Sequence, residues 1–532
     1  PKERIIKADI ESIAEHNGHG NAIAQVYNHI IMPLANEKDK ETQIKWGIRD
    51  FEYRFGRKPE GMWLAETAVD DDTLRLLEAN GIKFTILSPY QAEKFKKKGD
   101  KEWTDVSWGN IDPARSYKYN IKSAPGKSID LFFYDGAISR SVAFDELLKD
   151  GNKFIKRLKE GVSECRDYPQ LVHIATDGES YGHHTKFGDM ALAYVLKIRA
   201  KDEGFTITNY GEYLEKYRSD CEVEIKQASS WSCFHGVGRW KEDCGCSTGG
   251  HPGWNQKWRK PLRDALDYLR DELVVLFETE GQKYFDDVWN VRNNYISVIL
   301  DRNEMNVKKF QQENFKSDLS DDEKVHAMEL LEIQRQAMLM YTSCGWFFSE
   351  ISGIETVQIM KYAARAMQLA SKFTNKNLEE KFLNILAQAK SNIPEHGTGK
   401  DIFERFVKPS IVTTKQIASL WALSSLYEDF EDEESVYCYT VRRHAYKKVQ
   451  KGLSTFVVGH IEVQSKITLQ KSNVMFALMQ YAGGDFHCSI KEYSDDTEFN
   501  RIKTELIKTF LMNPLTEIIR ALDEYFGKEY FT

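Results

Sequence analysis

Acidic residues in the first part of the chain occupy positions that are suited to catalysis. Glu66, Asp135 and Asp177 each follow a short apolar run that is typical of a buried strand. The runs are Gly61-Met-Trp-Leu-Ala, Leu131-Phe-Phe-Tyr and Val172-His-Ile-Ala-Thr. Because the carboxyl ends of parallel strands meet at one edge of a sheet or barrel, we expect these carboxyl groups on the same rim.

Two carboxyl groups on one rim can cleave a glycosidic bond. One carboxylic acid protonates the leaving oxygen, while a second, ionised one attacks or shields the anomeric carbon; a separation of about 5–5.5 Å gives retention of configuration. Burial or a neighbouring negative charge keeps one acid protonated near neutral pH. A cluster of Glu66, Asp135, Asp177 and Glu179 could supply these charges. The spacing alone leaves open which two of them react.

The segment after Asp177 also allows a metal-dependent chemistry. Glycines flank Glu179 and allow the backbone to approach a ligand closely, and His183 and His184 follow. Metal-dependent polysaccharide deacetylases and mannosidases have barrels of related shape. A catalytic metal needs ligands from separate strands and an open position. Glu66 after a buried strand and a Trp-rich loop favour the metal-free mechanism, so no metal and no cofactor are predicted.

Residues 228–256 form a long segment without a regular period, and such loops are usually functional. Trp231, Trp240 and Trp254 are predicted as platforms on which sugar rings stack, although large aromatic residues also anchor loops. The segment contains Cys233, His235, Cys244 and Cys246 as well. Thiolates and imidazole are zinc ligands. Because the Cys-x-Cys spacing is awkward for one tetrahedral ion, we expect free packed thiols rather than zinc or a disulfide.

The pattern of elements predicts three units. Strand–helix alternation over 1–256 indicates parallel strands with crossover helices, as in an incomplete (β/α) barrel or a doubly wound sheet. Apolar residues at helical spacing predict a helical domain over 257–430. Period-two alternation and a helical tail predict a small β-rich unit with a C-terminal helix over 431–532.

Composition excludes several classes of protein. The chain has 532 residues, 41 % of them hydrophobic and 29 % charged, with a net charge of −8. No basic tract and no long apolar run stand out, so neither nucleic acid nor a membrane is an expected partner. The 8 cysteines are spread thinly, which favours a reducing cytoplasm. The chain begins at Pro1, and we expect it to be a trimmed or partial product.

Several segments resemble glycoside hydrolase family 57, the retaining α-amylase, glucanotransferase and glucan-branching group. Ala24–Leu34 looks like its second motif, Gly61–Glu66 like the third and Asp177–Glu179 like the fourth. Ser230, Trp231 and Trp240 resemble the fifth motif, and Phe133–Asp135 with Ser139 and Phe144 resembles a further segment. The first motif is absent, and we expect it upstream of Pro1.

The resemblance implies an incomplete, seven-stranded barrel and a retaining enzyme acting on α-1,4-glucan or a related oligosaccharide. It assigns Glu66 as the nucleophile and Asp177 as the general acid/base. The implied substrate contacts are His29, Trp63, Asp135, Glu179, His183, Trp231, Trp240 and Trp254. The extension beyond 257 is similar to that of an uncharacterised subgroup. A non-catalytic glucan-binding regulator is the alternative; hydrolysis versus transfer and the oligomeric state stay open.

Overall fold

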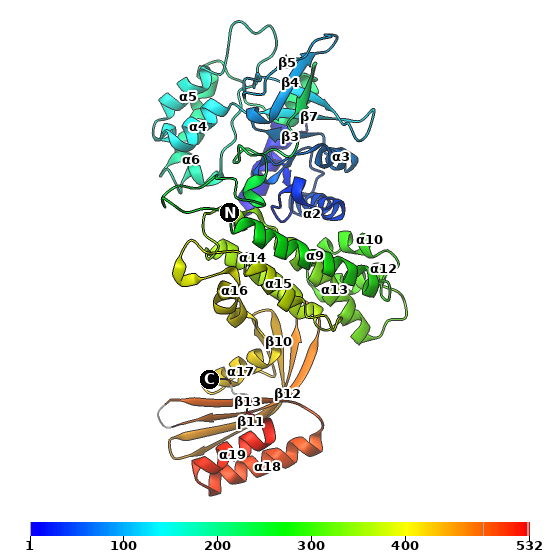
Figure 1. The fold of residues 1–532 in the computed structure, drawn as a ribbon, viewed down its shortest axis with the longest axis vertical. Helices are drawn as coiled ribbons and strands as arrows, with labels where there is room; N and C mark the ends of the chain where they lie inside the picture. Colours follow the sequence, from blue (N-terminus) through cyan, green and yellow to red (C-terminus); the bar gives the residue numbers. More distant parts are fainter. Residues whose placement is uncertain (1, 482–483, 529–530, 532) are drawn as a thin grey trace.

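The chain forms an elongated molecule with three regions stacked end to end (Figure 1). The computed structural model describes residues 2–481, 484–528 and 531, so Pro1 lies outside it. An N-terminal α/β region is followed by a helical region and then by an antiparallel sheet with its own helices. Among the described residues, no helix has both the length and the apolar character needed to cross a membrane.

Parallel strands lie at the centre of the N-terminal region. They are β1 (Ala24–Gln25), β2 (Met62–Trp63), β3 (Phe84–Leu87) and β7 (Ser128–Phe133). β1 pairs with β2, Gly61 before β2 bridges Phe84 of β3, and β3 pairs with β7, all in parallel. The predicted strand before Asp177 has no ladder of its own. It runs extended beside β7, where the His173 carbonyl accepts a hydrogen bond from the Asp135 amide (3.0 Å).

The sheet continues from β7 into strands that the sequence did not predict. They are β4 (Ala92–Lys97), β5 (Thr104–Asp105), β6 (Ser116–Asn120) and β8 (Cys221–Ile225), and the order is β3-β7-β6-β8-β4-β5. β6 runs antiparallel to β7, with Tyr119 opposite Ile129, and the short link between them makes a hairpin. The sheet is therefore mixed, because β3–β7 and β6–β8 pair in parallel and the other pairs are antiparallel.

Helices cover the parallel strands. They are α1 (Lys2–Glu15), α2 (Glu37–Phe55), α3 (Asp71–Ala79), α4 (Gly136–Phe144), α5 (Gly151–Lys159), α6 (Gly188–Tyr194), α7 (Ala200–Asp202) and α8 (Tyr210–Lys216). α2 begins where Asn36 caps the Asp39 amide and ends at Gly56, whose φ is 68°. A Cβ on Gly47 would lie 2.1 Å from the Gln25 carbonyl oxygen, so this glycine lets α2 pack directly on β1.

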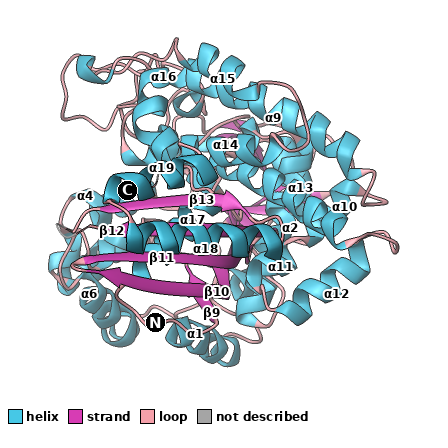
Figure 2. Ribbon diagram, turned by 90° about the horizontal axis from the view of Figure 1, so that it is seen from below, coloured by secondary structure: helices cyan, strands magenta, loops and turns pink. Residues whose placement is uncertain are grey.

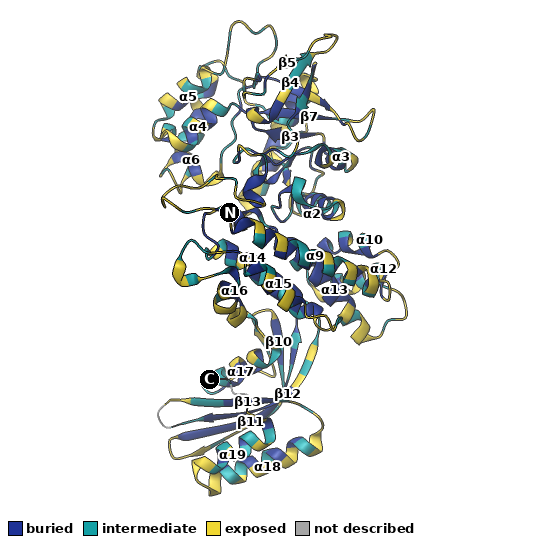
Figure 3. Cartoon of the chain, in the orientation of Figure 1, coloured by how far each residue is buried: buried dark blue, intermediate teal, exposed yellow. Residues whose placement is uncertain are grey.

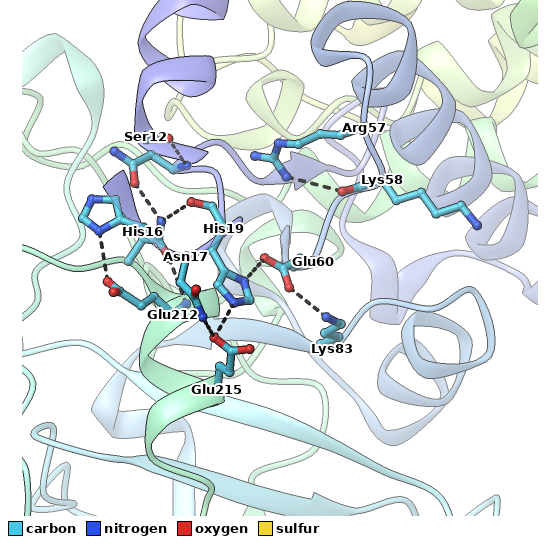
Figure 4. A network of polar contacts seen from close by, with 12 residues as sticks. Ser12, His16, Asn17, His19, Arg57, Lys58, Glu60, Lys83, Glu212 and Glu215 are labelled. Atoms are coloured by element: carbon cyan, nitrogen blue, oxygen red, sulfur yellow. Dashed lines mark hydrogen bonds and ion pairs between the residues drawn. The ribbon is translucent and has the colours of Figure 1, made fainter. Parts of the chain in front are cut away.

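A polar network closes the amino ends of the parallel strands (Figure 4). Glu60, just before β2, accepts hydrogen bonds from His19 (2.7 Å) and from Lys83 (2.8 Å), which precede β1 and β3. His16 of the N-terminal segment contacts Glu212 of α8 at 3.0 Å. These contacts hold neighbouring strands together at the end opposite to the carboxyl rim, where stabilising groups are expected in barrels.

The helical region shares one hydrophobic core with the strands. Its helices are α9 (Arg259–Gly281), α10 (Val288–Asn294), α11 (Ile296–Leu300), α12 (Glu304–Asn314), α13 (Asp321–Leu339), α14 (Ile354–Ala370), α15 (Leu378–Leu386) and α16 (Gly399–Ile402). The continuous core extends from Ala24 to Val407. Trp46 of α2 is fully buried and donates its indole N–H to the Arg292 carbonyl (3.2 Å). The strands and these helices therefore form a single packed body.

The C-terminal region is an antiparallel sheet between helices. Its elements are α17 (Thr414–Ser424), β9 (Glu433–Val436), β10 (Tyr439–Lys451), β11 (Ser454–Ser465), β12 (Lys471–Gln480), β13 (Phe486–Glu492), α18 (Asp496–Met512) and α19 (Leu515–Phe526). Val457 and Phe476 face the core with α17, whereas their neighbours Phe456 and Met475 face α18 and α19. Figure 2 shows α18 across the strands, and Figure 3 shows β11 and β12 buried. Because side chains alternate along each strand, the same strands supply apolar residues to the cores on both faces of the sheet.

The predicted fold class is confirmed: an incomplete barrel, a helical region and a C-terminal β-rich region follow one another. The division into units at residues 256 and 430 stays a prediction. Because α17 (Thr414–Ser424) packs on the C-terminal sheet, we propose that the last unit begins before residue 414.

Candidate active site

Glu66 lies directly after β2, in a short turn with left-handed backbone conformation. Its φ is 56°, and that of Thr67 is 51°. Such conformations cost about 1–3 kcal/mol each for residues with a side chain, and they cluster at functional sites. Trp231 donates its indole N–H (2.9 Å) and Ser232 its hydroxyl (2.6 Å), both to Oε2 of Glu66. Among the described residues, Oε1 has no hydrogen-bond partner, so one oxygen is held and the other is available.

Asp177 follows the extended segment beside β7 and is exposed to solvent. Its pKa is raised by partial burial first, then by the negative charges of Glu66 and Glu179. Positive charge on His184 and His29 would lower the pKa again. The Glu66 charge therefore acts on Asp177, and burial and charge together push Asp177 towards the protonated form.

His29 lies within the electrostatic influence of both carboxyl groups. Its φ is 53°, and its Nδ1 lies 2.8 Å from the hydroxyl oxygen of Ser343. The Ser343 amide donates to the His29 carbonyl (3.0 Å). Burial lowers the pKa of His29, and the charges of Glu66 and Asp177 oppose that shift. Because the pKa ends below its usual range, the imidazole is neutral at neutral pH and can donate or accept a hydrogen bond.

Ser343 comes from the helical region, in a 3₁₀ turn over Ser343–Trp346 that sequence reasoning did not connect with the site. The pKa of its neighbour Cys344 is raised by burial first and then by the Glu66 charge. Neither residue carries a signal in the sequence, because a lone serine or cysteine between helices has no distinctive pattern. The fold, rather than the local sequence, brings this turn to the rim.

Trp240 was predicted as a stacking platform, and the structure corrects this. The side chain is 1 % exposed, so neither ring face can meet a sugar. Its indole N–H instead donates to the Ser343 carbonyl (3.1 Å). Trp240 thus acts on the site indirectly, by fixing the turn that holds His29.

Trp63 and Trp231 lie together at the rim. Their rings are 5.2 Å apart at 68°, and Tyr134 lies 6.1 Å from Trp231. Trp63 and Trp231 are half-buried, so part of each ring remains accessible. Tyr134, which sequence reasoning did not select, completes this aromatic wall beside Glu66.

Asp135 and Trp254 make contacts with residues close to them in the sequence. Asp135 Oδ1 accepts the Ile138 amide (2.8 Å) and so caps α4, and its role as a sugar contact stays a prediction. Trp254 stacks on His251 with ring centroids 3.9 Å apart and an angle of 13° between the rings. This stacking gives the indole a partner within its own loop.

Glu179, His183 and His184 form an exposed cluster beside Asp177. His183 Nδ1 and His184 Nε2 each lie 3.8 Å from a carboxylate oxygen of Glu179. Their potential ligand atoms are within 4.8 Å of one another. All three come from one exposed turn, and no ligand from another strand among the described residues is added to them. The cluster gives the metal-dependent alternative little support.

Comparisons with known proteins cover both parts of the chain. Residues 3–226 match the family model of glycosyl hydrolase family 57, and residues 254–532 match the model described as a domain of unknown function (DUF3536). The N-terminal region therefore matches glycosyl hydrolase family 57, and the chain belongs to the DUF3536 family through the remainder. This confirms the resemblance drawn from the motifs and places the helical and β-rich extension in its own family.

Individual proteins are similar to parts of this chain. α-Amylase 1 of Dictyoglomus thermophilum is 23 % identical over 205 residues, which are 37 % of this chain and 27 % of that protein. This chain thus spans little more than a quarter of that relative. The exo-type maltose-forming amylase of Pyrococcus sp. ST04 has a similar fold, with a TM-score of 0.53 and 18 % identity over 73 % of this chain and 71 % of that one. The branching enzyme of Pyrococcus horikoshii aligns with a TM-score of 0.43 and 17 % identity over 76 % of this chain and 72 % of that one.

Proposed function

We propose that the protein is a retaining enzyme that cleaves or transfers α-1,4-glucan chains. The observation that carries the proposal is the pairing of Glu66, with one free carboxylate oxygen, and Asp177, whose pKa is raised by burial and by the Glu66 charge. Double displacement at an anomeric carbon needs a carboxylate nucleophile and a second carboxyl group that holds a proton, and the raised pKa of Asp177 favours the second role. The match of residues 3–226 to glycosyl hydrolase family 57 supports the substrate class.

In this mechanism, Oε1 of Glu66 attacks the anomeric carbon while Asp177 gives its proton to the leaving oxygen. The hydrogen bonds from Trp231 and Ser232 to Oε2 fix the carboxylate, so that little reorganisation is needed during attack. A covalent glycosyl-enzyme results. Asp177, now ionised, takes a proton from water or from a sugar hydroxyl, which then releases the glycosyl group.

The groups around the pair are proposed to bind the sugar. The neutral imidazole of His29 is positioned by Ser343 to contact a sugar hydroxyl. The accessible parts of Trp63 and Trp231 offer apolar faces for a sugar ring. Glu179 and His183 are exposed beside Asp177 and are proposed to contact the chain further from the cleaved bond.

The proposal is tested on amylose and maltooligosaccharides with Glu66→Gln and Asp177→Asn. We expect Glu66→Gln to abolish turnover and Asp177→Asn to slow it by about 10²–10⁴-fold. Glu146→Gln is a matched control, because Glu146 is another glutamate with positive φ (57°) whose carboxylate contacts Lys149 at 2.6 Å. It should retain full activity.

The same assay separates the alternatives. A wild-type protein that binds glucan but never cleaves or transfers it would support a regulatory binding protein instead. A metal-dependent mechanism predicts that His183→Ala loses all activity, whereas the two-carboxylate mechanism predicts that it retains most of it. The cytoplasmic location and the absence of nucleic-acid partners stay predictions from the sequence.

A further inference from the structure

Four potential metal ligands converge in the loop after the aromatic wall. Cys233 Sγ lies 3.9 Å from the sulfurs of both Cys244 and Cys246, and Cys246 Sγ lies 3.5 Å from His235 Nδ1. All four potential ligand atoms are within 4.8 Å of one another. Side chains from the two ends of a 14-residue stretch thus point at one centre.

These separations match the edges of a tetrahedron around a single zinc ion. With Zn–S bonds of about 2.3 Å and Zn–N bonds of about 2.0 Å, ideal tetrahedral angles place two sulfurs about 3.8 Å apart and a sulfur and a nitrogen about 3.5 Å apart. The sulfur–sulfur and sulfur–nitrogen distances in the structure are 3.9 and 3.5 Å. A disulfide requires sulfurs about 2.0 Å apart. An iron–sulfur cluster would place its ligands on different iron atoms and so spread them more widely.

The backbone explains how closely spaced cysteines can share one centre. Gly245, between Cys244 and Cys246, has a φ of 78°, which reverses the chain so that both sulfurs turn inward. Gly236, directly after His235, has a φ of 74°. The Cys-x-Cys spacing can therefore place two ligands on one ion, because the residue between the cysteines is a glycine with positive φ.

A buried positive group beside the sulfurs fits thiolates. Three thiolates, one neutral imidazole and Zn²⁺ carry a net charge of −1. The fully buried guanidinium of Arg259 lies 3.8 Å from Cys244 Sγ and supplies the opposite charge. A buried charge needs such a partner.

We propose that Cys233, His235, Cys244 and Cys246 bind one Zn²⁺ ion in a closed structural site. Binding releases the three thiol protons to solvent, and the four protein ligands leave no open position for catalysis. This replaces the expectation of free packed thiols.

The zinc site fastens the loop that orients the Glu66 carboxylate. Trp231 and Ser232, which donate to Glu66 Oε2, directly precede Cys233. The Ser230 hydroxyl donates to the Gly236 carbonyl (2.6 Å), so the start of the loop is tied to the ligand segment. Loss of the metal is expected to increase hydrogen exchange of the backbone over residues 230–246 while the C-terminal sheet stays protected.

Metal content of the purified full-length protein tests the proposal without any activity assay. We expect about one zinc per chain by inductively coupled plasma mass spectrometry, and far less in Cys246→Ser. Cys165→Ser is the matched control, because Cys165 is an exposed free cysteine outside the cluster, and it should keep its zinc. If Cys246→Ser does not fold, zinc X-ray absorption of the wild type provides the test, with three sulfurs at about 2.3 Å and one nitrogen at about 2.0 Å expected.

Other outcomes would overturn the site. They are a metal-free protein that stays metal-free after refolding with zinc, a disulfide within the cluster found by mass spectrometry under non-reducing conditions, or zinc coordinated only by oxygen and nitrogen. Because none of these measurements depends on glucan turnover, failure of the proposed enzymatic function would leave the zinc proposal standing.

Discussion

At the level of single residues, the raised pKa of Asp177 has a direct kinetic consequence. As the general acid, Asp177 must be protonated, so activity falls as pH rises through its pKa. Burial, the Glu66 charge and the Glu179 charge all raise that pKa. Removing the Glu179 charge therefore lowers it, and the alkaline limb of the pH profile of kcat/KM in Glu179→Gln should move to lower pH.

The control for this shift is Glu146→Gln, which removes a glutamate charge elsewhere and should leave the alkaline limb in place. A Glu179→Gln profile that coincides with the wild type, or moves to higher pH, would mean that Asp177 does not set this limb.

Ser343→Ala tests the contribution of the helical region to the site. The variant loses the hydroxyl contact to His29 Nδ1 (2.8 Å), so the imidazole is less well positioned. A hydrogen bond of this kind contributes about 0.5–1.5 kcal/mol, which corresponds to a fall of about 2- to 13-fold in kcat/KM. Steady-state kinetics on maltooligosaccharides measure it, and Ser343→Thr, which keeps a hydroxyl, should retain more activity than Ser343→Ala. Equal losses in both variants would argue against the hydrogen bond.

How far the site could be predicted differs from residue to residue. Glu66 and Asp177 could be predicted as candidates because each follows an apolar run. His29 could be predicted because it lies in a segment that resembles a family motif. Asp135 also follows an apolar run, but it directly precedes a helix as well. An acid in that position is the signal for an N-cap, and the structure shows Asp135 capping α4. The burial of Trp240 depends on the turn at Ser343, about a hundred residues away, so no local pattern could reveal it.

At the level of elements, the parallel strands were predictable because they are short and strongly apolar. The hairpin of β6 and β7 was not predicted, although Tyr117 and Tyr119 of β6 alternate with polar residues and Pro125-Gly126 marks the turn. The segment before Asp177 has the composition of a strand, yet it makes isolated hydrogen bonds instead of a ladder. Composition therefore indicated its extended form but not its pairing.

A buried ion pair links α2 to α10 and gives a stability prediction. Arg292 Nη1 donates to Asp39 Oδ1 (2.7 Å), with side-chain exposures of 1 % and 7 %. Asp39→Asn leaves the buried guanidinium without its counter-charge and should lower the free energy of unfolding by about 3–5 kcal/mol. Urea unfolding followed by tryptophan fluorescence measures the change.

The matched control is the exposed pair of Lys7 and Glu11, whose side chains are 76 % and 62 % exposed. Glu11→Gln should change the free energy of unfolding by less than about 1 kcal/mol. Similar losses in Asp39→Asn and Glu11→Gln would show that the buried pair does not join the two regions as described.

At the level of the whole molecule, the helical region completes the barrel. One continuous core extends from Ala24 to Val407, whereas the cores on the two faces of the C-terminal sheet are separate clusters. The membership of 254–532 in one family thus does not coincide with the packing, since the first part of this stretch belongs to the body that carries the site. This packing places Ser343 of the helical region beside His29 of the site.

The separate cores predict how the chain tolerates truncation. A chain ending at residue 412 keeps the continuous core and should fold and turn over glucan, whereas residues 1–256 alone expose one side of that core and should be insoluble. Circular dichroism and glucan turnover of the two truncated chains test this. An active 1–256 chain would contradict the role given to the helical region.

The central claim is that Glu66 forms a covalent bond with the sugar while Asp177 handles the proton. It is tested most directly with Asp177→Asn and α-maltosyl fluoride, whose leaving group needs no protonation. Attack by Glu66 should proceed and release should stall, so mass spectrometry of the digested protein should find a maltosyl group on the peptide that contains Glu66. A maltosyl group on another residue, or release of a sugar of inverted configuration without any adduct, would contradict it.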